Sequence, residues 1–155
     1  MAANATKQPL DDAAKAIIGQ LQIDGRRSYA EIGKAVGLSE AAVRLRVQRL
    51  VGDGVMQIVA VTDPARLGFT REAMIGLGVD GDIRAVADAL TAIDEVSYAV
   101  MTAGRFDVLV ELVCEDDEHL ITLLHERIRT IPGVTSTETL IYLDLFKEHY
   151  RWGTR

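Results

Sequence analysis

The spacing of apolar residues changes once along this chain, and that change constrains the fold more than any other feature. Up to about residue 51, apolar side chains recur every three or four positions, which is typical of amphipathic helices. From residue 72 onward, segments with the two-residue alternation of strands are interleaved with two helical segments. A chain of 155 residues can form two small domains, and we place them at 1–63 and 64–155, on either side of the break at Asp63–Pro64.

Three short helices are predicted in the first domain. The first covers roughly residues 10–22. Ser28 and Glu31 have the spacing of a capping box at the start of the second helix. Gly37 ends that helix in a tight turn, and Ser39 caps the third helix. Two short helices joined by so small a turn match the helix-turn-helix motif, whose second helix enters the major groove of DNA.

The third predicted helix, which runs to about Val51, has one face for packing and one for contact. Val43, Val47 and Leu50 fall in one narrow sector at about 100° per residue, so they should pack on the other two helices. Arg46 lies nearer this packed side and is assigned either to a phosphate or to a structural ion pair. The expected DNA contacts combine small residues that permit close approach with donors for bases or phosphates: Ser39, Ala41, Ala42, Arg44, Leu45, Gln48 and Arg49.

The distribution of charge agrees with this assignment. The net charge is -6, yet residues 1–63 carry 8 Lys/Arg against 7 Asp/Glu, whereas 64–155 carry 9 against 16. Between Arg26 and Arg49, six basic residues stand against two acidic ones, so this stretch can meet phosphate. The alternative is a solvated basic helix face. Leu45 counts against it, because an apolar side chain in a polar face indicates a contact such as a thymine methyl.

A strand is predicted over Val55–Val61, and it would give the head a small wing. The second domain then has the order strand, helix, strand, strand, helix, strand, over residues 72–79, 82–92, 96–101, 106–114, 116–130 and 134–146. This order predicts an α+β chain whose second domain is a βαββαβ, ferredoxin-like sheet with both helices on one face. Its strands are apolar on both sides, so a second copy should cover the bare face in at least a dimer.

The residues of both halves resemble the Lrp/AsnC family of transcriptional regulators. Two runs in the second half, Gly104–Asp107 and Ile131–Val134, match motifs of the family's amino-acid-sensing (RAM) domain. The matching runs of the head and linker are Leu10–Asp11, Asp24–Arg26, Ser28–Ile32, Val36–Ser39, Val43, Arg46–Val47, Arg49–Leu50, Gly54–Val55, Asp63–Pro64 and Leu67–Gly68.

The resemblance implies a cytoplasmic, nucleoid-associated regulator that binds double-stranded DNA in a sequence-specific way. Its other partners would be a small effector, an amino acid or related metabolite, and further copies of itself, as a dimer, an octamer or another assembly of dimers. No cofactor, membrane partner or enzymatic activity is implied.

Effector contacts are placed by the resemblance on Gly104, Phe106, Asp107, Thr137 and Thr139. Asp107 could receive an α-ammonium group, and Gly104 leaves backbone amides accessible to a carboxylate. The residues alone favour a hairpin turn in which Asp107 bonds nearby backbone, and only the resemblance favours the effector role. Ala103 and Arg105 depart from the family's pattern, and Arg105 could favour an effector with an extra acidic group.

Catalytic and metal motifs are not found. His119, His125 and His149 lack metal-ligand spacing, and the single cysteine, Cys114, is interpreted as a small buried apolar residue. Neither a phosphate-binding glycine loop nor a nucleophile elbow occurs. Two alternatives stay open: an enzyme resembling the sirohaem decarboxylases, against which the basic third helix argues, and an architectural DNA-binding protein without an effector.

Overall fold

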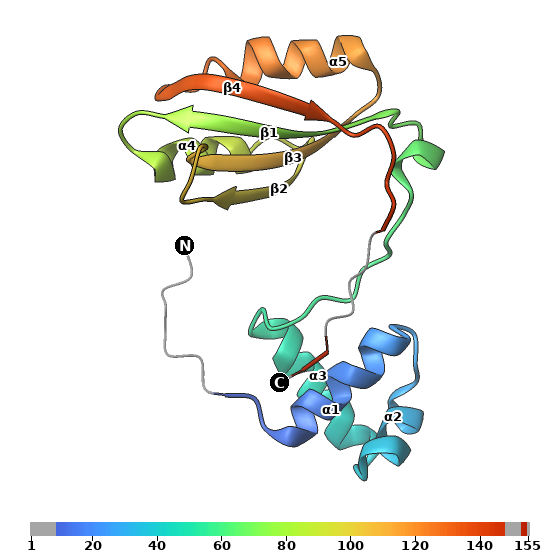
Figure 1. Cartoon of the computed structure of the whole chain (residues 1–155). Helices are drawn as coiled ribbons and strands as arrows, with labels where there is room; N and C mark the ends of the chain where they lie inside the picture. Colours follow the sequence, from blue (N-terminus) through green and yellow to red (C-terminus); the bar gives the residue numbers. More distant parts are fainter. Residues whose placement is uncertain (1–8, 148–152, 155) are drawn as a thin grey trace. The chain divides into compact units, whose positions relative to one another are not determined.

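The computed structural model describes residues 9–147 and 153–154 (Figure 1). The chain divides into two compact units, with the boundary between Ala60 and Val61 and the second unit ending at Phe146. The domains expected from the sequence meet instead at 63/64. Residues 148–152 and 155, which belong to the second expected domain, lie outside the described residues.

The first unit contains three helices, α1 (Asp12–Ile23), α2 (Tyr29–Val36) and α3 (Glu40–Gly52). The predicted capping box is confirmed, because the Ser28 side chain accepts from the backbone N–H of Glu31 while the Glu31 side chain accepts from that of Ser28. Hydrogen bonding to Ser28 also lowers the pKa of Glu31. Gly37 adopts φ 73°, a left-handed conformation that suits glycine, and so ends α2. The N-cap role of Ser39 is likewise confirmed by its bond from the N–H of Ala42.

The core of the helical unit confirms the predicted phase of α3. Val43, Val47 and Leu50 are all buried, and Val43 and Val47 pack in one cluster with Ile17 of α1 and Ile32 of α2. Because this side of α3 packs in the core, the opposite side of the helix is exposed to solvent.

The predicted strand over Val55–Val61, and with it the wing, is wrong. After α3 the chain makes a turn and then runs without regular structure through residues 56–63. A strand needs a hydrogen-bonded neighbour, and among the described residues all four strands belong to the second unit and none pairs with this segment. Ile58, Val59 and Val61 are exposed here, so apolar and β-branched residues alone did not make a strand.

The second unit confirms the predicted ferredoxin-like sheet (Figure 1). Its strands are paired in the order β2-β3-β1-β4, and every pairing is antiparallel. In chain order its elements are η1 (Pro64–Leu67), β1 (Arg71–Val79), α4 (Ile83–Thr91), β2 (Val96–Met101), β3 (Val108–Cys114), α5 (Asp117–Thr122), η2 (Leu123–Ile128) and β4 (Val134–Ile141).

Both helical segments pack on one face of this sheet. A single core cluster joins Ile75 and Val110 of the sheet to Leu90 of α4 and to Leu120 and Ile128 of the second helical segment. The alternate strand positions, among them Met74, Leu109 and Val113, point to the other face and are only half-buried. The expected alternation is therefore confirmed, although the outer face also carries Glu111 opposite Met74 and Glu138 opposite Gly76.

Two predicted elements end earlier than expected. The last strand stops at Ile141 rather than Phe146, because its partner β1 begins at Arg71 and the N–H of Tyr142 makes the final bond to Glu72. The helix predicted over 116–130 is α-helical only to Thr122 and continues as the π-helix η2. Within the described residues, no helix has the length and apolar character needed to cross a membrane.

Candidate DNA-binding and effector sites

The outward side of α3 presents the residues that the sequence assigns to DNA. Leu45 is 50% exposed in the middle of this face, although it is a large apolar residue. Ala42 and Arg46 are half-buried at its margins. The other predicted contact residues are exposed: Ser39, Ala41, Arg44, Gln48 and Arg49. The structure thus brings the predicted set together on one helix and its cap.

Arg44 is held by two neighbours in the head. Its Nη2 atom donates to Oε1 of Glu40 at 2.8 Å, one helical turn earlier. Its guanidinium also lies over the ring of Tyr29, 5.2 Å from the centroid, and so makes a cation–π contact with the first residue of α2. Glu40 was not among the predicted contact residues. Its i, i+4 spacing to Arg44 is the sequence signal that could have found it.

Arg46 forms the structural ion pair that was one of its two predicted roles. Its Nη1 atom donates to Oδ2 of Asp11 at 2.7 Å, and the other carboxylate oxygen of Asp11 accepts from the N–H of Ala14 at 2.7 Å. These two hydrogen bonds, with the backbone bond first, lower the pKa of Asp11. The side chain of Arg46 therefore ties α3 to the start of α1.

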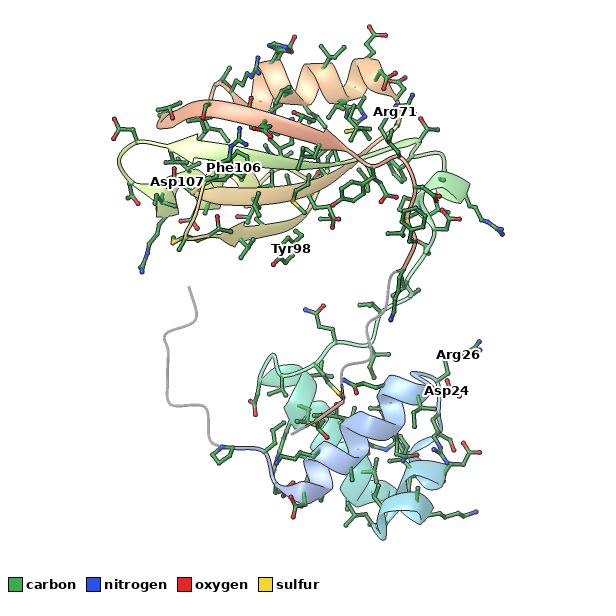
Figure 2. The ribbon with its side chains drawn as sticks, in the orientation of Figure 1. Asp24, Arg26, Arg71, Tyr98, Phe106 and Asp107 are labelled. Atoms are coloured by element: carbon green, nitrogen blue, oxygen red, sulfur yellow. The ribbon has the colours of Figure 1, made fainter. Side chains whose placement is uncertain are left out.

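Further basic residues surround the helices of the head. Arg27 bonds Gln20 of α1, whereas the backbone N–H of Arg26 donates to Asp24 at 2.9 Å in the turn between α1 and α2. Figure 2 shows the Arg26 side chain extending from this turn. Lys34 is exposed near the end of α2. These cations add to the positive charge on the head but lie outside α3.

The loop between β2 and β3 is fastened to β1 by Asp107. Its carboxylate oxygen Oδ2 accepts from the N–H of Val79 at 2.8 Å, and its own N–H donates to the carbonyl of Leu77 at 2.9 Å. Its carbonyl accepts from the N–H of Thr102, also at 2.9 Å. Asp107 therefore bonds nearby backbone, as the hairpin alternative expected, and it does so through its Oδ2 atom, its N–H and its carbonyl.

Phe106 belongs to the same loop and lies against the sheet (Figure 2). The Phe106 ring lies on Gly76 of β1 so closely that a Cβ there would come within 2.6 Å of ring atoms. Arg105 stands 5.2 Å from the centroid of that ring and pairs with Glu138 of β4 at 2.6 Å. Glu138 is thus the β4 residue that reaches the loop, and the sequence analysis missed it.

The two threonines assigned to the effector site lie on the other side of the sheet. Thr137 and Thr139 pair with Leu77 and Ile75, whose side chains face the helices. Thr137 accepts a hydrogen bond from Nε of Arg129 at 2.9 Å. Within one chain, the structure therefore groups Phe106 and Asp107 but leaves the threonines apart from them. Gly104 is exposed, and a Cβ there would meet no atom within 4 Å.

Other reactive side chains have structural surroundings. Burial raises the pKa of Cys114 to about 11, so its thiol stays protonated at neutral pH, and its predicted place in the core is confirmed. His119 lies 3.3 Å from Glu95, His125 is exposed, and His149 falls outside the described residues. Across the described parts of the chain, no cluster of three His, Cys, Asp or Glu side chains could hold a metal ion.

A helix-turn-helix head with an open recognition helix, joined to a separate ferredoxin-like domain, defines a two-domain DNA-binding regulator. Family models support both parts: the AsnC-type helix-turn-helix domain matches residues 10–51, and the Lrp/AsnC ligand binding domain matches residues 72–152. The chain belongs to the Lrp/AsnC family of transcriptional regulators.

Known proteins similar to this chain cover almost its whole length. The transcriptional regulator FL11 of Pyrococcus horikoshii is 36% identical over 90% of this chain and 93% of its own. The crystal structure of the leucine response regulatory protein LrpA of Mycobacterium tuberculosis superimposes with a TM-score of 0.86 at 28% identity, covering 94% of this chain and all of the other. A feast or famine regulatory protein of M. tuberculosis, solved in complex with L-methionine, gives a TM-score of 0.83 at 28% identity and the same coverage.

Proposed function

We propose that this regulator reads operator DNA through the outward face of α3 and responds to a small amino acid or related metabolite bound beside the 104–107 loop. The observation that carries the first part is the exposed, mixed face of α3. Leu45 is open to contact there, and Gln48 and Arg49 supply donors beside it. Binding to operator DNA would associate the protein with the nucleoid.

The DNA-reading role of this face is tested with Gln48→Ala. A glutamine that contacts a base edge contributes roughly 1 to 3 kcal/mol of discrimination, so binding to DNA selected from a random pool should weaken by that amount and binding to random DNA by less. Gln57→Ala, an exposed glutamine beyond α3, is the matched control. Kd values measured at several salt concentrations should also show weaker binding at high salt. Equal losses on both DNAs would remove the base-reading role.

The effector half of the proposal is supported by a loop that is bonded to β1 and open at Gly104. Asp107 and Phe106 fix the loop on β1, and the space above Gly104 is open. Backbone amides left accessible in this way can receive a carboxylate, and the second oxygen of Asp107 can receive an ammonium group. The L-methionine complex of the similar M. tuberculosis protein supports an amino acid as the class of ligand.

The effector site is tested by thermal shift with a panel of amino acids that begins with L-methionine. A ligand at 100 times its Kd should stabilise the wild-type chain by about 2.7 kcal/mol. Gly104→Val should fold normally, since the new side chain meets open space rather than the protein. It should lose this response, because the side chain would occupy the space proposed for the ligand. Asp107→Asn should also lose it, because the amide oxygen can still accept from Val79 while the negative charge is gone. Both variants should keep effector-free DNA binding.

Regulation further requires that the effector change DNA affinity. We expect a coupling of roughly 1 to 3 kcal/mol, which is about 5- to 150-fold in Kd. The same titration with Asp107→Asn should show none. An Asp107→Asn protein that still responds fully would remove Asp107 from the site, whereas a wild-type protein that binds its operator but no metabolite would favour an architectural role.

A further inference from the structure

Glu40 places a carboxylate at the N-terminal end of α3, and this is the end with which a recognition helix contacts bases. It is the first residue of that helix, and its side chain is 53% exposed. The N-terminal residues of a recognition helix are those that approach base edges. A negative charge at this point is repelled by phosphates, so it needs a compensating contact if it is to remain at the interface.

Arg44 supplies that compensation in the free protein. Nη2 of Arg44 lies 2.8 Å from Oε1 of Glu40. This ion pair has no net charge, so it does little to neutralise phosphate. The guanidinium of Arg44, 55% exposed, is also held over the ring of Tyr29. Because only one of its N–H groups bonds Glu40, donors remain for a second partner. Both charges are thus positioned on one side of the helix before any DNA arrives.

The chemistry of one base pair matches this arrangement. In the major groove, guanine presents two adjacent acceptors, N7 and O6, and the cytosine opposite presents an amino donor at N4. An arginine fits the first group with two donors, and a carboxylate accepts from the second. We propose that Glu40 and Arg44 together read one G·C pair in each half-site, Arg44 donating to guanine and Glu40 accepting from cytosine. This inference rests on the proposed role of α3 as the reading helix.

The experiment selects DNA from a fully randomised duplex pool with the full-length chain, its Glu40→Ala variant and its Arg44→Ala variant. Kd values are then measured on the best wild-type duplex and on versions altered one pair at a time. At one position, Glu40→Ala should reduce the preference for G·C by roughly 5- to 150-fold, the range for one good base contact. The same variant should bind random DNA more tightly, because it has lost a negative charge. Arg44→Ala should lose the preference at that same position but bind random DNA more weakly.

Two further variants distinguish a lost base contact from a change in net charge or in folding. Asp53→Asn removes an exposed carboxylate from the opposite end of α3 and should leave every base preference unchanged. Glu40→Gln keeps the length of the side chain and an oxygen that can accept from cytosine, so it should retain more of the G·C preference than Glu40→Ala while it also binds random DNA more tightly than the wild type.

Three outcomes overturn the inference or the function beneath it. If Glu40→Ala leaves the G·C preference unaltered, Glu40 does not read a base and only repels phosphate. If the Glu40 and Arg44 variants lose preferences at different positions, the two residues do not read the same base pair. A wild-type chain that selects no sequence would instead defeat the proposed reading function itself.

Discussion

Asp11 accepts hydrogen bonds from two helices at once, with one carboxylate oxygen for each. One oxygen caps α1 at Ala14, and the other receives Arg46 from α3. Asp11 stabilises the head most when it is ionised, because a protonated carboxyl loses the charge that both donors favour. The consequence is a dependence of head stability on pH that can be assigned to one residue.

We predict that Asp11→Asn lowers the melting temperature at neutral pH and that the difference from wild type disappears in acid. Asparagine caps helices about as well as aspartate, so the variant isolates the ion pair with Arg46. The pKa of Asp11 is lowered in the folded state, so its contribution is present above the unfolded pKa near 4 and is lost as pH falls through the folded value. Melting curves from neutral pH to about pH 2 check this. A difference that persists unchanged in acid would contradict it.

The turn between α2 and α3 depends on a close backbone approach at Gly33. A Cβ at this position would lie 2.5 Å from the carbonyl oxygen of Leu38, and Leu38 in turn donates its N–H to the Gly33 carbonyl at 2.9 Å. A backbone atom cannot swing aside as a flexible side chain can. The angle at which α3 leaves α2, and so presents its reading face, therefore depends on this residue having no side chain.

We predict opposite effects for two glycine-to-alanine changes in the head. Gly33→Ala should destabilise it by about 1 to 3 kcal/mol through overpacking against Leu38. Gly19→Ala, in the interior of α1 with nothing within 4 Å, should stabilise it by roughly 0.5 to 1 kcal/mol through helix propensity. Urea unfolding of both variants measures the two signs. If Gly33→Ala proved as harmless as Gly19→Ala, the close approach would not constrain the turn.

Local signals predicted these helices well because their causes are local. The Ser28–Glu31 capping box and the turn at Gly37 each act within a few residues, so the sequence is sufficient to locate them. The strand predicted at Val55–Val61 failed because strand formation depends on a distant neighbour that the segment lacks. The same holds in the candidate effector site, where Glu138 rather than a threonine meets Arg105, a contact that joins positions 33 apart in sequence.

The two halves of the chain differ in net charge, and this difference agrees with their different functions. Residues 1–63 carry nearly balanced charge, and six of their eight basic residues fall between Arg26 and Arg49, whereas residues 64–155 carry 16 acidic against 9 basic residues. An acidic sensing domain is repelled by the phosphate backbone, so contact with DNA is left to the head. The sensing domain instead has apolar residues on the sheet face that its helices leave uncovered, and this feature bears on assembly.

We propose, finally, that the chain associates through the outer face of its sheet into at least a dimer. Met74, Leu109 and Val113 of the central strands lie on this face, and Tyr98 and Leu140 extend it onto the outer strands. Among the described residues, the helices of this unit pack on the opposite side. Glu111 lies between Met74 and Tyr98 on this face and accepts a hydrogen bond from Tyr142, but exposed apolar side chains gathered around it often mark an interface. Two-fold pairing of sheets would also supply two recognition helices for successive half-sites.

The prediction is that residues 64–155 form a dimer without the head, as measured by light scattering over a range of concentrations. Leu109→Glu, in the middle of the outer face, should convert this dimer to a monomer, because a charge buried between two sheets without a partner is strongly unfavourable. Leu45→Glu in the full chain is the matched control: it adds the same charge to the exposed face of α3 and should leave the dimer intact while weakening DNA binding. A well-folded monomer of residues 64–155 would contradict the proposal, since its apolar face would then tolerate water.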